Sequence, residues 1–207
     1  MNKLTSTLLV CALLLAVLGG ALVFYDKLSV EIPSQSLAVA PEEATQPGSM
    51  ENAQSTAPAE AEKVSAPDFT VLDTEGSEVS LTDFFGKPIV LNFWASWCSP
   101  CKSEMPDFDA AYQTYGEEIH FLMVNLTDGS RETVQTASDF IAQQGYTFPV
   151  YFDTKYSAAM AYGTSAIPVT SAIPVTFFID AEGFPVAYSQ GALNAEVLQK
   201  GIDMILN

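Results

Sequence analysis

The sequence has 207 residues, room for one domain of ordinary size plus extensions, and it carries 25 acidic against 8 basic residues for a formal net charge of −17. Residues 66–207 alone hold 18 acidic and 5 basic residues, a net charge of −13. Such a surface repels phosphate groups, so the composition excludes a nucleic-acid partner and argues against binding to anionic lipid headgroups.

The first predicted element is an apolar span at residues 8–25, which is uncharged and close to the roughly 20 residues that a bilayer-spanning helix requires. The alternative is a cleaved signal peptide, but the Ala-x-Ala sequence at 38–40 lies well beyond the span and is followed by Pro41. We therefore expect residues 1–28 to be a signal anchor with one transmembrane helix. Lys3 precedes the span and two opposite charges follow it, which places everything after the span outside the cytoplasm.

Residues 29–65 form the second region, which is rich in Ala, Pro, Ser, Glu and Gln and poor in large apolar side chains. This composition cannot bury enough surface to offset the entropy lost on ordering. Its six acidic residues, against Lys63, favour an extended chain. The sequence predicts a disordered acidic linker, most simply a spacer with no binding role.

The folded part begins with two alternating stretches around a glycine turn in residues 69–81, a pattern that predicts a β-hairpin. Residues 88–94 form a nearly continuous apolar run, typical of a central strand that is covered on both faces. A helix is expected to begin near Cys98 and to end at Gly116. Pro106 falls inside it, which requires a kink or an early break.

A second buried strand is predicted at 119–125, followed by a helix that runs to Gly145, for which Asp128 and Ser130 are candidate caps. The apolar face of this helix is predicted from the spacing of Val134, Ala137, Phe140 and Ile141. The remaining elements are a short helix at about 155–162, strands at 175–180 and 184–188, and a final helix at about 194–206. The alternation of helices with the first strands predicts an α/β layer arrangement.

Two cysteines separated by two residues, Cys98 and Cys101, lie where the strand at 88–94 gives way to a helix. Unpaired N–H groups and the macrodipole at a helix N-terminus favour a negative charge, so we expect Cys98 to be the thiolate nucleophile and Cys101 the resolving thiol. Lowering the pKa of a cysteine by about 1.5 units takes roughly 2 kcal/mol, which is at the upper limit of what a helix end supplies. The Cys101 thiol and local N–H groups are therefore expected to contribute. Ser99 and Pro100 set the stiffness of the loop and hence the relative stability of dithiol and disulfide.

The neighbouring residues argue against other uses of this motif. A haem attachment site needs His directly after the second cysteine, where this chain has Lys102. A zinc site needs a second pair of ligands, but residues 66–207 contain no third cysteine and only His120, which we expect to pack on its strand. A peroxidatic cysteine would have Thr at the position of Ala95. A structural disulfide stays open as an alternative, although a disulfide that closes so short a loop would add little to the stability of the fold.

Residues 92–106, NFWASWCSPCKSEMP, with the preceding hairpin and residues 173–180, IPVTFFID, resemble the TlpA/ResA group of membrane-anchored, thioredoxin-like thiol-disulfide oxidoreductases. The resemblance covers nearly all of residues 66–207, and its motif is specific. It implies a thioredoxin fold outside the cytoplasm. Such a fold has a central mixed sheet flanked by helices, here with an N-terminal β-hairpin and an inserted strand-helix unit.

The resemblance also implies roles for single residues. It assigns the catalytic pair to Cys98 and Cys101, and it implies that Glu104 helps proton movement. The alternative for Glu104 is a solvated carboxylate on the first turns of a helix. Asn92 stands where cytoplasmic thioredoxins keep a buried Asp, so their proton relay is not assumed. Trp97 is expected to shield the disulfide and to contact partners, or else simply to pack.

The hexapeptide SAIPVT occurs twice in succession, at 165–170 and 171–176, and the resemblance implies one cis-proline beside the dithiol. If Pro168 had this role, Pro174 would lie inside the following central strand, where it cannot donate a ladder hydrogen bond. We therefore predict that the Ile173-Pro174 bond is cis, with the backbone of Ile173 turned toward the dithiol. Pro168 is then trans, in a six-residue insertion that is either a neutral bulge or a change in which partners dock.

These observations lead to one main hypothesis, an anchored extracytoplasmic enzyme that reduces protein disulfides through the Cys98-Cys101 pair, with no other cofactor and no metal. By resemblance, its electrons come from a membrane thiol transporter of the CcdA/DsbD type, and maturation of apocytochrome c is one use. A disulfide-forming oxidant is the runner-up in the same chemistry. A module that uses the dithiol to bind or deliver a metal is the alternative from a different class.

Overall fold

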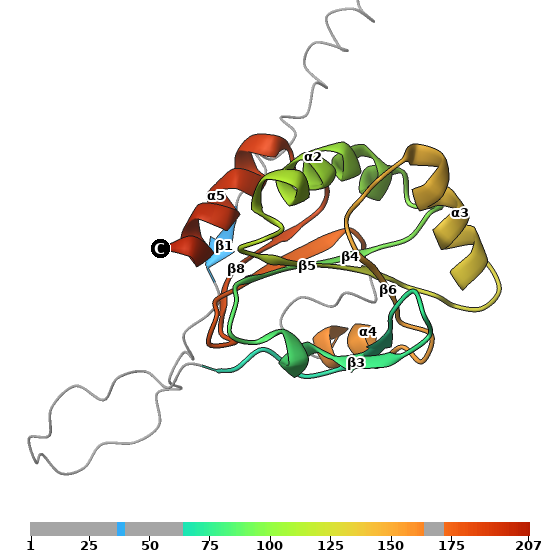
Figure 1. Ribbon diagram of the computed structural model, residues 1–207, viewed down its shortest axis with the longest axis horizontal. Coiled ribbons are helices and arrows are strands. Elements are labelled where there is room, and N and C mark those ends of the chain that lie inside the picture. Colours follow the sequence, from blue (N-terminus) through green and yellow to red (C-terminus); the bar gives the residue numbers. More distant parts are fainter. Residues whose placement is uncertain (1–36, 40–63, 164–171) are drawn as a thin grey trace, which may run out of the picture. The chain divides into compact units, whose positions relative to one another are not determined.

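The computed structural model describes residues 37–39, 64–163 and 172–207, which are drawn in colour in Figure 1. The predicted span at 8–25, most of the linker and the first copy of the SAIPVT repeat, including Pro168, lie outside the described residues. Among the residues that are described, no helix has the length and apolar character needed to cross a membrane.

The described strands form one mixed sheet with the order β1-β8-β7-β4-β5-β6-β2-β3. β4 lies inside the sheet, parallel to β5 and antiparallel to β7, so the strand that leads to the CxxC motif has neighbours on both sides. The strands are β1 (Ala38–Val39), β2 (Thr70–Leu72), β3 (Glu78–Ser80), β4 (Ile89–Trp94), β5 (His120–Asn125), β6 (Val150–Phe152), β7 (Val175–Ile179) and β8 (Pro185–Gln190).

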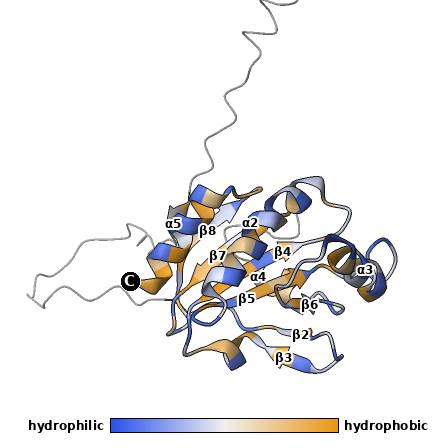
Figure 2. Cartoon of the chain, turned by 45° about the horizontal axis from the view of Figure 1, so that its top comes forward, coloured by the Kyte–Doolittle hydropathy of each residue, from blue (hydrophilic) through white to orange (hydrophobic). Residues whose placement is uncertain are grey.

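Helices cover both faces of this sheet. In Figure 1, α2 and α5 lie on one face of the sheet, and α4 lies on the other face. Figure 2 shows hydrophilic and hydrophobic residues alternating along α5, whose apolar residues pack on the sheet. The helices are η1 (Leu81–Phe84, a 3-10 helix), α2 (Ser99–Tyr115), α3 (Val134–Gln144), α4 (Ser157–Gly163) and α5 (Ala195–Leu206).

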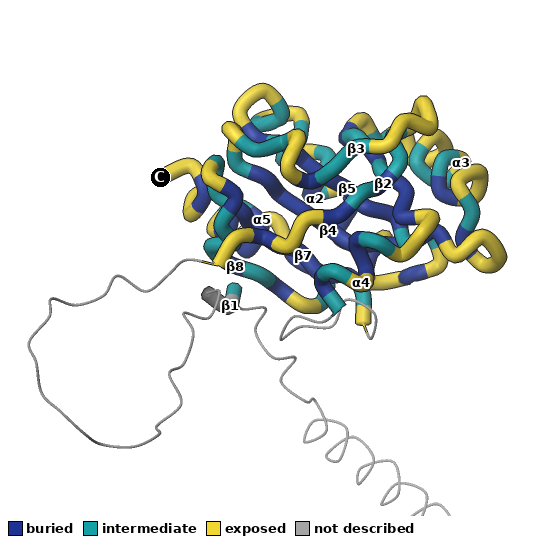
Figure 3. Tube along the Cα trace, turned by 90° about the horizontal axis from the view of Figure 1, so that it is seen from below, coloured by how far each residue is buried: buried dark blue, intermediate teal, exposed yellow. Residues whose placement is uncertain are grey.

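Alternation along β4 builds two hydrophobic cores, one on each face of the sheet. Val90 and Trp94 belong to the cluster under α2 and α5, whereas Ile89, Leu91 and Phe93 belong to the cluster under α4 and the hairpin. All six residues of β4 are buried, as expected for a strand that is covered on both faces, and Figure 3 shows this strand as buried. The prediction of a central strand at 88–94 is therefore confirmed.

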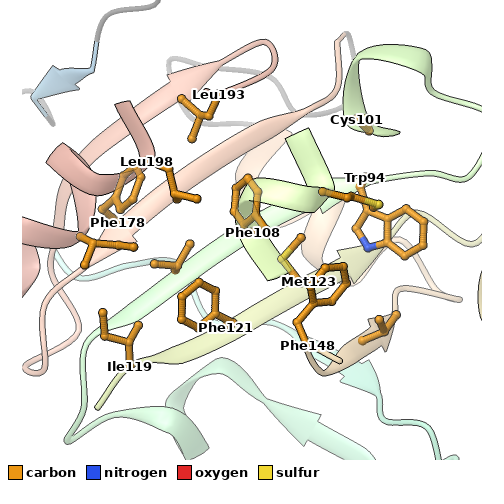
Figure 4. Close-up of a cluster of buried hydrophobic side chains, with 14 of the residues drawn as sticks. Trp94, Cys101, Phe108, Ile119, Phe121, Met123, Phe148, Phe178, Leu193 and Leu198 are labelled. Carbon is orange, nitrogen blue, oxygen red and sulfur yellow. The ribbon is translucent and has the colours of Figure 1, made fainter. Parts of the chain in front are cut away.

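The cluster under α2 reaches the CxxC motif. Figure 4 shows Trp94 and Cys101 at one end of this cluster and Phe178 and Leu198 at the other. Cys101 belongs to this cluster. Since core side chains are packed as densely as a crystal of small molecules, its side chain has little freedom to move.

The structure corrects the predicted start of α3. Thr133 is its N-cap, with Oγ1 accepting a hydrogen bond from the N–H of Thr136 at 3.1 Å. Asp128, which we expected to cap the helix, instead accepts from the N–H groups of Ser130 and Glu132 and closes a turn ahead of it. Asx turns of this kind compete with capping because the same carboxylate can satisfy only nearby donors.

Three further expectations differ from the structure. Val134, placed on the apolar face of α3, is 42% exposed. α2 continues through Pro106 to Tyr115, so an early break at the proline is wrong. β1 lies within the segment expected to be a linker without structure, yet Ala38 pairs with Tyr188 and Val39 with Ala187 at an edge of the sheet. An unpaired edge accepts any short extended stretch, because backbone pairing does not depend on side chains.

We predict that Gly201→Ala destabilises the fold. A Cβ at this position on α5 would lie 2.2 Å from ring carbons of Phe178 on β7. At an open helix site the same change stabilises by about 1 kcal/mol, whereas here we expect a loss of about 1–3 kcal/mol in the free energy of unfolding, measured with urea. Phe178→Leu should make room, so the double variant should lose less than the sum of the single changes. A Gly201→Ala protein that is as stable as the wild type would contradict this packing.

Candidate active site

Cys98 lies at the junction between β4 and α2. The N–H of Cys98 donates to the carbonyl of Ala95 at 3.1 Å, which closes a tight turn between the strand and the helix. Cys98 is the N-cap of α2, and its Sγ accepts a hydrogen bond from the N–H of Cys101 at 3.2 Å. The two sulfurs form a disulfide, with S–S at 2.05 Å and Cα atoms 5.3 Å apart. The predicted pair is thus brought together with the first sulfur at the helix N-terminus.

The two cysteines differ in exposure. Cys98 is 5% exposed, whereas Cys101 is fully buried in the core. An open groove of about 610 Å³ borders Cys98, and its lining includes Trp97, Pro100 and Tyr156. Cys98 therefore lines the groove and Cys101 does not, while the roles of nucleophile and resolving thiol stay predictions.

The second copy of the repeat supplies the cis-proline. The peptide bond between Ile173 and Pro174 is cis, as predicted. The Sγ of Cys98 lies 3.6 Å from the carbonyl oxygen of Ile173, and Ile173 also lines the groove. The backbone before Pro174 is therefore positioned beside the sulfur of Cys98, at the entry to β7.

Glu104 is a buried carboxyl group one helical turn after Cys101. It is 1% exposed, and its oxygens accept from Asn92 Nδ2 and from the N–H of Leu193, both at 2.8 Å. Asn92 Nδ2 also donates to Thr176 Oγ1 at 3.0 Å. Burial raises the pKa of Glu104 to about 8, although the hydrogen bonds from Leu193 and Asn92 act in the opposite direction. The alternative of a solvated carboxylate is wrong, and a buried carboxyl with a raised pKa lies one helical turn from Cys101.

Other predicted residues lie at the surface around the dithiol. Trp97 is 40% exposed and borders the groove, where the guanidinium carbon of Arg131 lies 3.8 Å from its ring centroid. Ser99 and Pro100 are the first two residues of α2 and also line the groove. His120 packs edge-on against Phe84, with ring centroids 5.3 Å apart, as the packing interpretation expected.

The sequence reasoning missed several residues of this region. Arg131 and Tyr156 line the groove, and Glu132 is a fully buried carboxylate that binds the turn before Cys98. None of them belongs to a periodic pattern, so only the fold brings them to the motif. Tyr156 is the one of these residues with unusual local geometry, a positive φ of 55°, which its sequence does not predict. Within the described part of the chain, no group of three or more His, Cys, Asp or Glu side chains is arranged to hold a metal ion.

Comparison with known proteins gives consistent relatives. The AhpC/TSA family matches residues 63–187. Thiol-disulfide oxidoreductase ResA of Geobacillus thermodenitrificans is 34% identical over 141 residues, which cover 68% of this chain and 75% of that protein. ResA of Bacillus subtilis is 31% identical over 141 residues, covering 68% of this chain and 73% of that protein.

Solved structures agree with these sequence relatives. A putative thiol:disulfide interchange protein DsbE from Chlorobium tepidum matches with a TM-score of 0.59 and 30% identity, covering 70% of this chain and 97% of that one. StoA from Bacillus subtilis matches with a TM-score of 0.55 and 29% identity, covering 66% of this chain and 97% of that one. The predicted thioredoxin fold, with a mixed sheet flanked by helices, is thereby confirmed.

We predict that Glu104→Gln changes the pH dependence of stability. The wild-type carboxyl holds its proton in the folded state until about pH 8, whereas in the unfolded chain it ionises near its ordinary pKa of 4.5. The wild type should therefore lose stability relative to Glu104→Gln as the pH rises from about 4.5 to about 8, by on the order of a few kcal/mol. Urea unfolding of both oxidised proteins across this range measures the difference. A difference that does not vary with pH would show that Glu104 titrates normally.

Proposed function

The chain belongs to the AhpC/TSA family and is a ResA-like thiol-disulfide oxidoreductase, and from this premise we propose that it reduces protein disulfides outside the cytoplasm. The observation that carries the proposal is the position of Cys98, which caps α2 with its sulfur and lines the groove, while Cys101 is fully buried. A substrate disulfide can reach one sulfur of the pair and not the other.

The proposed reaction has two exchange steps. The Cys98 thiolate attacks one sulfur of a substrate disulfide, a mixed disulfide forms, and the other substrate sulfur leaves as a thiolate that takes up a proton. Cys101 then loses its proton and attacks Cys98, which releases the reduced substrate and forms the Cys98-Cys101 disulfide. Glu104 lies one turn from Cys101, and we propose that its ionised form, whose fraction grows as the pH approaches its pKa of about 8, accepts this proton.

The hydrogen bonds at Cys98 favour the reducing direction. A strongly oxidising pair is one whose reduced form is stabilised, above all by donors and cations at the thiolate. Among the described residues, the N–H of Cys101 is the one group that donates to this sulfur, and Arg131 stacks on Trp97 instead. The negative charge of the domain further disfavours a thiolate. A disulfide-forming oxidant is therefore the weaker candidate.

Location and partners extend this proposal. The apolar span at 8–25 and the acidic segment after it support a domain tethered to the outer face of the membrane. Electrons would then enter through a membrane thiol transporter of the CcdA/DsbD type, and apocytochrome c is one candidate substrate. The dithiol metal module has less support, since Cys101 is buried and a metal in the groove would find only Cys98 as a ligand.

We predict that the full chain reduces insulin disulfides with a reduction potential near that of thioredoxin, about −270 mV, and not near the roughly −120 mV of strong periplasmic oxidants. Equilibration with glutathione measures the potential. Cys98→Ser should abolish turnover, and Cys101→Ser should accumulate the mixed disulfide, visible on non-reducing gels. A potential near that of the oxidants would reverse the proposed direction, and a stable adduct in Cys98→Ser but not in Cys101→Ser would reverse the two cysteine roles.

A further inference from the structure

The turn that delivers Cys98 to α2 is held at both of its central residues by two consecutive residues of another loop. Ser96 and Trp97 are the middle of this turn, which closes through the hydrogen bond from Cys98 to Ala95. The middle N–H groups of a tight turn have no partner within the turn itself. Glu132, from outside the turn, accepts hydrogen bonds from the N–H and the hydroxyl of Ser96. Arg131, also from outside the turn, covers the ring of Trp97.

Glu132 binds Ser96 with both of its carboxylate oxygens. Oε1 accepts from the N–H of Ser96 at 2.8 Å, and Oε2 accepts from the Ser96 hydroxyl at 2.6 Å. Oε1 also accepts from Asn125 Nδ2 at 2.6 Å. Glu132 is fully buried. Burying a carboxylate is unfavourable unless its hydrogen bonds are complete, so these contacts define one position for the group.

The backbone of Glu132 is also held in place by hydrogen bonds, which fixes the position of its carboxylate. The N–H of Glu132 donates to Asp128 Oδ1 at 2.9 Å, and its carbonyl accepts from the N–H of Gly129, also at 2.9 Å. Asn125, its side-chain partner, is the last residue of β5, which pairs with β4. Glu132 therefore connects the turn before Cys98 to the central sheet.

Arg131 makes a second, independent contact with the same turn. Its guanidinium lies over the ring of Trp97 at 3.8 Å, a cation–π arrangement at the surface. Ser96 is thus held from the buried side and Trp97 is covered from the exposed side. No periodic pattern in the sequence links these two pairs of residues.

We propose that Glu132 is a positioning residue that holds Cys98 at the N-terminus of α2 when the Cys98-Cys101 disulfide is open. In the oxidised protein the S–S bond itself restrains Cys98, whatever the turn does. Once the bond is reduced, the contacts of the turn are what keep the sulfur of Cys98 near the N–H of Cys101. Glu132 acts through Ser96 and does not touch the reacting sulfurs. This inference rests on the redox role of the cysteine pair and holds for either direction of electron flow.

Loss of the contact between Glu132 and Ser96 should affect the stability of the two redox forms unequally. Weakening the contact between Glu132 and Ser96 should destabilise the dithiol more than the disulfide, because the disulfide retains its covalent restraint. In the reaction of the protein disulfide with two glutathione thiols, which gives the protein dithiol and oxidised glutathione, the equilibrium should then shift toward the protein disulfide. Cys98 should also ionise at higher pH, because its thiolate loses a well-placed N–H donor.

Ser96→Ala is the deciding variant, because it removes the hydroxyl hydrogen bond and leaves every charge in place. Glu132→Ala removes all the contacts together with one negative charge, and Glu132→Gln removes the charge but keeps an amide that can bond to Ser96. The difference between these two variants therefore separates geometry from charge. Thr147→Ala is the matched control, since Thr147, like Ser96, donates both its N–H and its hydroxyl to one carboxylate. This carboxylate belongs to Asp109 on α2.

The experiment measures three quantities on the full chain: the equilibrium with glutathione, the pH dependence of Cys98 alkylation by iodoacetamide, and urea unfolding in each redox form. We expect Ser96→Ala to shift the glutathione equilibrium at least threefold toward the disulfide and to lower stability more in the reduced protein. Glu132→Ala should lie further toward the disulfide than Glu132→Gln, and Thr147→Ala should leave the equilibrium unchanged. If Glu132→Ala does not fold, Ser96→Ala decides. Equal losses of stability in both redox forms of Ser96→Ala, with an unchanged equilibrium, would reduce Glu132 to a structural residue and leave the proposed function intact.

Discussion

The interaction on which the rest of the site depends is the capping of α2 by the sulfur of Cys98. A helix begins with N–H groups that have no partner inside the helix, and here one of them, that of Cys101, points at the sulfur. In the proposed reaction, the same contact that starts the helix therefore also prepares the nucleophile. The capping atom is also the reacting atom, so the strand, the turn and the helix must be held rigidly against one another for the chemistry to work.

The rigidity comes from the position of β4 inside the sheet. Its six residues are buried on both faces, and its two neighbours, β5 and β7, each bring one functional element to its end. β7 brings Ile173 and the cis-proline, while the loop after β5 brings Arg131 and Glu132. Elements that are distant in the chain thus meet around Cys98 and the turn before it, because their strands are neighbours in the sheet.

Two buried carboxyl groups divide the supporting work. Glu104 has a raised pKa, because burial outweighs its two hydrogen bonds, and it lies one helical turn from Cys101, which must lose a proton in the proposed reaction. The Glu132 side chain accepts three hydrogen bonds and binds the turn before Cys98, which it is proposed to hold in place. Both positions carry an energetic penalty that apolar residues would avoid, which fits the tendency of strained or costly groups to cluster at functional sites.

The parts of this protein that local rules govern could be predicted from its amino-acid sequence. The CxxC spacing at the start of a helix identified Cys98 and Cys101, the apolar run identified the central strand, and the rule that proline cannot donate inside a sheet selected Pro174. The burial of Glu104 and the hydrogen bonds from Ser96 to Glu132 could not be predicted in this way, since both depend on which elements pack together in the fold. Sequence periodicity shows which face of an element is apolar, but it does not say which partner that face meets.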